Sequence, residues 1–133
     1  MTGWKTTLVR GSEACLAALD FDAADVVASP FQHPAWLAAW ARAFPDPAGE
    51  RVFLVEARER EGGPIALRLP VALERWSGVV VLRGWDRGTA DYGGAILTRG
   101  FEPSAEDTRT LWRAVAAVLP ACDVLVLDKL PAR

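Results

Sequence analysis

The chain has 133 residues, of which 51% are hydrophobic and 24% charged, a balance typical of one globular domain. At this length, folding buries about two thirds of the surface of the unfolded chain, so a core needs neither disulfides nor structural metals. Lysine and arginine number 15 against 17 acidic residues, and this balance excludes the broad positive surface of nucleic-acid-binding and lipid-binding proteins. We therefore expect a single domain over residues 1–133, with neither nucleic acid nor a membrane as its partner.

The N-terminus, the apolar runs and the cysteines indicate the cellular location. The first residues lack the charged and then apolar segments of a signal peptide. The longest uncharged run, residues 26–41, is too short and too polar to cross a bilayer. Cys15 and Cys122 lie far apart in apolar surroundings, without the paired spacing of a metal or redox motif. We expect two buried, reduced thiols and a cytoplasmic protein.

The first part of the chain predicts one strand and two helices. β-Branched residues at positions 6–10 indicate a strand that stops at Gly11. Ser12 is expected to be the N-cap of a short helix that ends near Asp20. Pro34 is typical of a first helical turn, and Pro45 ends the second helix. The apolar face of this second helix consists of Trp36, Leu37, Trp40 and Phe44.

An antiparallel meander is expected next. The apolar runs at 51–57 and 65–73 flank a charged tip that ends in Gly-Gly-Pro, which predicts a hairpin. Residues 79–82 and 95–97 are expected to continue the meander as a third and a short fourth strand. In the second strand, Pro70 cannot donate to a ladder, so we expect a bulge or a locally unpaired edge there. Alternation predicts a buried face with Leu67, Leu69, Val71 and Leu73, and a wetter face with Ala66, Arg68, Ala72 and Glu74.

The last part of the chain predicts a helix followed by a strand. Ser104 and Asp107 fit a capping box, and the apolar stripe that follows indicates a helix that ends at Pro120. Residues 123–128 form a continuous apolar run, which is typical of an inner or parallel strand covered on both faces. The predicted order of elements is therefore β-α-α-β-β-β-(β)-α-β.

The aromatic residues divide into two groups. Six tryptophans are many for this length. Those on predicted helix faces are expected in the core, namely Trp36, Trp40 and Trp112. Those near strand ends are expected at a half-exposed edge or interface, namely Trp4, Trp76 and Trp85.

Few residues offer catalytic chemistry. His33 is the one histidine, so a two-histidine zinc site is excluded; this residue either caps the second helix or points into a cleft. Residues 83–94 combine glycines with Asp91 and with Tyr92, an acceptor and a phenolic donor, either as a binding loop or as a turn with polar caps. The candidate catalytic residues are thus Asp91, Tyr92 and His33, with no candidate cofactor-binding or metal-binding residues. Neither nucleotide-binding glycine motif, GxxxxGK[ST] or GxGxxG after a strand, is present.

Four segments, together with the order of elements, carry a resemblance to a known family. The segments are ASPFQHPAWLAAW (28–40), LRLPVAL (67–73), DYGG (91–94) and VLVLD (124–128). The chain resembles the N-terminal half of CelD-like acetyltransferases, which belong to the GNAT superfamily and are associated with cellulose and exopolysaccharide biosynthesis. The resemblance implies a GNAT-like α/β fold, an α+β sandwich whose mixed, mostly antiparallel sheet has helices on both faces. It also implies that the C-terminal part of that fold, a helix and two strands, is missing here.

The resemblance implies that acetyl-CoA or another acyl-CoA serves the full family protein. The family binds the CoA pyrophosphate at a Q/R-x-x-G-x-G/A turn before a helix. The nearest run here, residues 75–80, has Val80 at the second small position and precedes a strand, so we expect no cofactor in this chain. Enzymatic activity of the chain itself is therefore left open.

Three functional hypotheses follow. The first is a non-catalytic GNAT-like module that supports acyl transfer to an amine or sugar acceptor, with the C-terminal acyltransferase half as its partner. The second is an interaction module that completes its sheet with a second copy, as a homodimer. The third is a small CoA-dependent N-acetyltransferase that uses the loop at 83–94.

Overall fold

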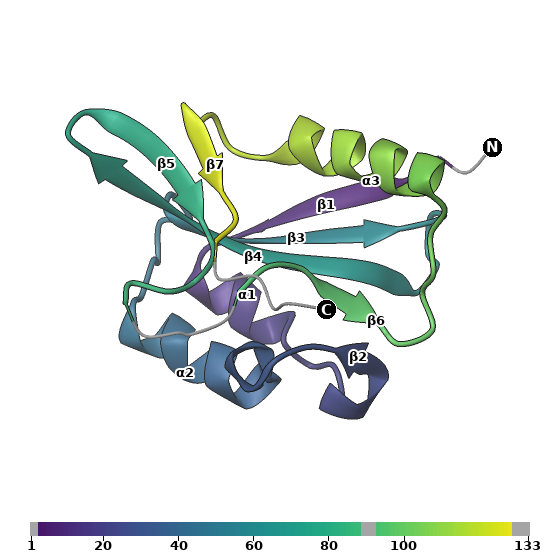
Figure 1. Cartoon of the computed structure of the whole chain (residues 1–133). Coiled ribbons are helices and arrows are strands. Elements are labelled where there is room, and N and C mark those ends of the chain that lie inside the picture. The colour runs from purple at the N-terminus through teal and green to yellow at the C-terminus, as the bar shows by residue number, and fades with distance from the viewer. Residues whose placement is uncertain (1–2, 89–92, 129–133) are drawn as a thin grey trace.

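The computed structural model describes residues 3–88 and 93–128. Within this part of the chain, seven strands form one mixed, mostly antiparallel sheet with the path β1-β3-β4-β5-β7, and helices cover both of its faces (Figure 1). The strands are β1 (Lys5–Arg10), β2 (Val26–Val27), β3 (Val52–Arg58), β4 (Ile65–Trp76), β5 (Val79–Arg83), β6 (Ile96–Thr98) and β7 (Val124–Val126). The helices are α1 (Ser12–Ala17), α2 (Pro34–Ala43) and α3 (Ala105–Val118), with 3-10 turns η1 (Ala23–Asp25) and η2 (Pro30–Gln32). The expected α+β class is thus confirmed at this coarse level.

The predicted meander is confirmed for three strands. β3 pairs antiparallel with β4, and β4 with β5, across the Ser77–Gly78 turn. β6 departs from the expectation because it pairs with β4 and with β2, and not with β5. The two-residue strand β2 was not predicted, since two valines carry too little periodicity to be recognised.

Two hydrophobic clusters lie on opposite faces of the sheet. Helices α1 and α2 cover the face that carries Val52 and Leu54. Helix α3 covers the other face, where Leu111 and Val115 pack against Val55 and Leu69 (Figure 1). Because successive side chains of a strand point to opposite faces, the central strands contribute to both clusters.

The predicted wetter face of β4 is largely buried, which corrects the expectation. Ala66, Arg68 and Ala72 are all buried, because the α1–α2 side covers this face of the sheet as well. The Arg68 guanidinium lies 4.3 Å from the centroid of the Phe21 ring. Burial lowers the pKa of the Arg68 guanidinium below its usual range.

Pro70 marks an unpaired edge and no bulge. The Leu73 N–H donates to the Arg51 carbonyl, at 2.8 Å, so the backbone of Pro70, three residues earlier, faces away from β3. On that side β6 pairs with residues 67–68 and β5 pairs from Ala72 onward. Pro70 therefore lies where one neighbouring strand gives way to the other, and its missing N–H leaves no ladder bond unmade.

The three helices begin in different ways. α3 starts with the predicted capping box, in which the Ser104 hydroxyl accepts from the Asp107 N–H at 3.0 Å. The prediction that Ser12 is the N-cap of α1 is wrong. The N-cap is Gly11, at φ 86°, and Ser12 is the first helical residue. The Ser12 hydroxyl instead accepts the Asp46 N–H at 2.9 Å, so a contact distant in sequence takes the side chain that was expected to cap the helix.

β7 is parallel to β5, as the apolar run predicted, but it is not an inner strand. It is the last strand of the sheet path in the described residues, and Val124 is 44% exposed. The expectation that both faces are covered is therefore wrong. Among the described residues, none of the helices has the length and apolar character needed to cross a bilayer.

Candidate functional site

The candidate site lies around the loop that follows β5, where the carboxyl ends of the parallel strands β5 and β7 meet. The loop is anchored by Trp85, whose Nε1–H donates to the carbonyls of Phe53 (3.2 Å) and Val71 (3.1 Å). Its ring stacks on Trp40 with centroids 5.1 Å apart. Trp85 is buried, which corrects the expectation of a half-exposed edge position. The beginning of the loop is therefore fixed to the core.

Arg83 joins the loop to three strands. Its Nη2 donates to Asp86 at 3.0 Å and to Asp128 at 3.1 Å, and its Nη1 lies 3.8 Å from Glu74. The guanidinium also lies 5.6 Å from the centroid of the Trp76 ring. One cation thus balances carboxylates from β4, from the loop and from the residues after β7, which holds this end of the sheet together.

His33 caps helix α2. Its Nδ1 accepts the Ala35 N–H at 3.0 Å, which is the capping alternative of the sequence analysis. Because Nδ1 accepts, the neutral ring carries its proton on Nε2. The ring is exposed, so Nε2 is the atom left to contact a ligand.

Gln32 brings the start of α2 to the other end of the loop. Its Nε2 donates to the carbonyls of Gly93 (3.3 Å) and Gly94 (3.0 Å), and its Oε1 accepts the Ser29 N–H at 2.8 Å. Sequence analysis missed this residue. The S-x-x-Q spacing of a capping box at positions 29–32 was the signal that could have found it.

Asp91 and Tyr92 lie outside the described residues, so their role stays a prediction. The contacts of Gln32 with Gly93 and Gly94 place the described flank of the loop beside the residue that precedes His33. The structure therefore brings the loop and the start of α2 together, although the two are about sixty residues apart.

Asp46 is a buried carboxylate that sequence analysis also missed. It accepts the backbone N–H groups of Arg51 (2.8 Å), Val52 (2.8 Å) and Glu50 (3.2 Å). Burial by itself would raise the pKa of Asp46, but these hydrogen bonds outweigh burial and hold it below its usual 3.8. This carboxylate organises the connection between α2 and β3.

Both cysteines are free, and only Cys15 is fully buried; Cys122 is half-buried. Burial, followed by the negative charges of Asp46 and Glu56, raises the pKa of the Cys15 thiol to about 12. Such a thiol is a poor nucleophile at neutral pH. In the described part of the chain, no group of three histidine, cysteine or acidic side chains is placed to hold a metal ion.

Comparisons with known proteins add no family assignment. No protein-family model matches the chain, and no curated protein and no solved structure matches it.

Proposed function

We propose that this chain is a non-catalytic, GNAT-like module that binds an acyltransferase domain through the open edge of β7. In this role it supports acyl transfer from acyl-CoA to an amine or sugar acceptor, which the partner domain carries out. The open apolar edge of β7 is the observation that carries the proposal.

The backbone of β7 is oriented for strand addition. The Val80 carbonyl accepts the Asp123 N–H at 2.8 Å, so Val80 and, by alternation, Leu82 face β7, where Leu82 lies opposite Leu125. In a parallel pair Leu82 then bonds to Val124 and Val126, and the N–H and C=O groups of Leu125 point away from β5. On that side the described residues contain no further strand. An edge of this kind readily pairs with a strand of another chain.

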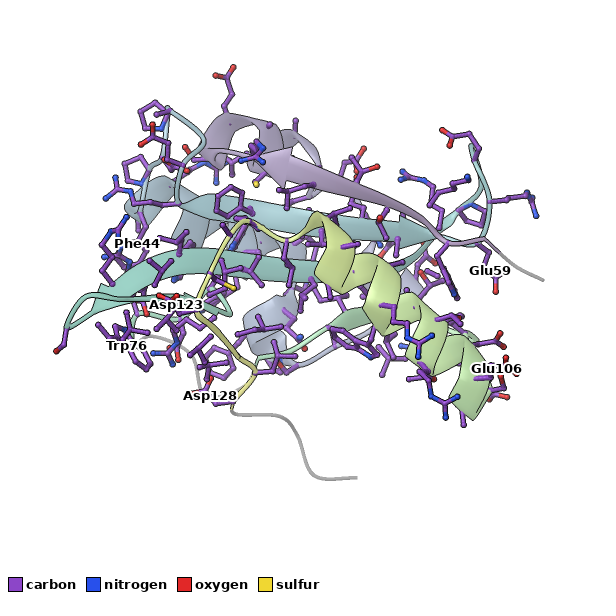
Figure 2. The ribbon with its side chains drawn as sticks, turned by 90° about the horizontal axis from the view of Figure 1, so that it is seen from above. Phe44, Glu59, Trp76, Glu106, Asp123 and Asp128 are labelled. Atoms are coloured by element: carbon purple, nitrogen blue, oxygen red, sulfur yellow. The ribbon has the colours of Figure 1, made fainter. Side chains whose placement is uncertain are left out.

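Exposed apolar side chains accompany the edge. Val124 is 44% exposed, and the neighbouring hairpin adds Trp76 at 46% and Val79 at 40%. Trp76 and Val79 are cross-strand partners, and Val124 pairs with Val81, two residues after Val79. The three side chains, which we call the β7 patch, therefore lie on one face of the sheet, and Figure 2 labels Trp76 at this end. Contiguous exposed apolar surface of this kind marks interaction sites.

Charge favours a different chain over a second copy as the occupant. Asp123 and Asp128 flank β7 (Figure 2). If β7 paired antiparallel with its own copy, centred on the strand, Asp123 would lie within one position of Asp128 of the copy at both ends, and like charges this close across a pair of strands are destabilising. The better partner is an apolar strand with basic ends. That this strand belongs to an acyltransferase rests on the resemblance of the sequence.

A peptide titration tests the edge. We expect a capped peptide Arg-Val-Thr-Val-Thr-Val-Arg to bind the full chain in calorimetry, and the same peptide with glutamate ends to bind at least about tenfold more weakly. Leu125→Pro removes the outward N–H without removing a bond to β5, so it should weaken binding by about tenfold. Leu125→Val keeps that N–H and is the matched control. Equal affinity for both peptides, or equal affinity of both variants for the first peptide, would contradict strand addition at the edge of β7.

Two further measurements test the rest of the proposal. Light scattering should give the mass of a monomer; a dimer abolished by Leu125→Pro would instead identify a second copy as the occupant. Titration with acetyl-CoA should give no heat of binding. Saturable binding would overturn the non-catalytic assignment and favour a small acetyltransferase.

A further inference from the structure

A cavity of about 210 Å³ lies where α2 ends and β3 begins, apart from the β7 patch. Its wall exposes both polar and apolar surface, with Phe44 and Pro45 from the end of α2 and Val52 and Leu73 from the sheet among the apolar residues that line it. Arg51 and Arg87 also line it. Apolar side chains beside a few placed charges are the combination that small-molecule sites use to bind and orient a ligand.

The positive charges of the cavity are not neutralised by ion pairs. The salt bridges of the described residues all involve Arg83, so neither Arg51 nor Arg87 has a carboxylate within 4 Å there. Asp46 also lines the cavity, but its carboxylate already accepts three backbone N–H groups. Its hydrogen-bonding capacity is therefore largely used, and although its charge interacts with that of Arg51, two guanidinium groups outnumber this one carboxylate in the lining. The cavity keeps a net positive charge and donors for another acceptor.

Arg87 is held in a conformation that arginine disfavours. Its φ is 49°, in the left-handed region where glycine is preferred, and Gly88 follows with φ 76°. The guanidinium lies 5.1 Å from the centroid of the Phe44 ring. The backbone thus places a cation against an aromatic wall of the cavity, an arrangement that a glycine at this position would not supply.

We infer that this cavity binds a small organic anion with a flat apolar group. The apolar group packs against Phe44, Pro45 and Val52. The carboxylate or phosphate accepts hydrogen bonds from Arg51 and Arg87, because the planar guanidinium matches either group. This inference does not depend on the proposed function.

Titration of the ¹⁵N-labelled chain by NMR tests the inference, with four probes. Phenyl phosphate and benzoate should bind and shift the Trp40 indole N–H and the amides of Arg51 and Val52. Benzyl alcohol, which lacks the charge, and inorganic phosphate, which lacks the apolar group, should each bind at least about fivefold more weakly than phenyl phosphate. Equal binding of benzyl alcohol, or no shift of these signals by 20 mM phenyl phosphate, would overturn the inference.

Two variants separate binding from folding. Arg87→Gly relieves the positive φ, so the melting temperature should stay the same or rise while phenyl phosphate binds about tenfold more weakly. Arg51→Ala should weaken binding to a similar extent. Arg113→Ala, at an exposed position on α3, is the matched control and should bind as the parent does. Unchanged affinity in both cavity variants would contradict the assignment.

Discussion

Asp46 shows how one side chain organises a connection at the residue scale. Three backbone N–H groups in a row, at residues 50–52, would lack partners at the start of β3 without its carboxylate. Its own N–H donates to Ser12 Oγ, which ties the same segment to α1. The residue therefore links two helices and a strand.

We expect Asp46→Asn to lower the free energy of unfolding by about 1–3 kcal/mol, because the amide accepts with one oxygen and lacks the charge. The pKa of Asp46 is lowered by folding, so its contribution is complete above the unfolded value of 3.8 and is lost as the pH falls through the folded value. Urea unfolding at pH 7 and at pH 3 measures both effects. The difference between parent and variant should shrink at the lower pH.

Asp25→Asn is the control for this prediction, since that side chain is exposed. It should change the stability by less than about 0.5 kcal/mol. A variant at Asp46 as stable as the one at Asp25 would show that the carboxylate contributes nothing.

At the scale of elements, the β4–β5 turn is not optimal for its geometry. Ser77 (φ 49°) and Gly78 (φ 85°) both adopt positive φ, the pattern of a type I′ hairpin turn. Asparagine tolerates this conformation better than serine does.

We therefore expect Ser77→Asn to stabilise the chain by about 0.5 kcal/mol, and Gly78→Ala to destabilise it by about 1 kcal/mol or more. Thermal unfolding followed by circular dichroism measures both changes. A lower melting temperature for Ser77→Asn would mean that serine makes a contact that the turn geometry does not explain.

Local rules predicted those elements whose ends are set by neighbouring residues. The capping box at Ser104 and the prolines at 34 and 45 correctly placed α3 and α2. The same reasoning failed for the start of α1, because the Ser12 hydroxyl accepts a hydrogen bond from the N–H of Asp46, a residue distant in sequence. Capping is predictable when no distant residue competes for the side chain.

At the scale of the whole molecule, the two hydrophobic clusters are joined by the strands that they share. Leu54 faces the α1–α2 side and Leu69 the α3 side, and both are fully buried on paired strands. Neither face can lose its packing without disturbing the backbone of β3 and β4. The molecule should therefore unfold as a unit.

We expect Leu54→Ala and Leu69→Ala each to cost about 2–5 kcal/mol and to keep a single transition. Circular dichroism and tryptophan fluorescence should give coincident midpoints for both variants. Separate transitions in either variant would show that the two faces unfold independently. Ala38→Gly, at a partly buried position of α2, changes helix propensity without removing a large core side chain. It should lower the free energy of unfolding by about 1 kcal/mol.

The sequence by itself determined the order of the main strands and helices, the β3–β4–β5 meander and the capped start of α3. These depend on periodicity, prolines and turn residues within a few positions of one another. Only the tertiary structure decided that the Arg68 face of β4 is buried, that β6 returns to β4, and that Trp85 anchors its loop. It also decided that β7 lies at an edge. Alternation shows which side chains share a face, but what covers that face is chosen by segments far away in the chain.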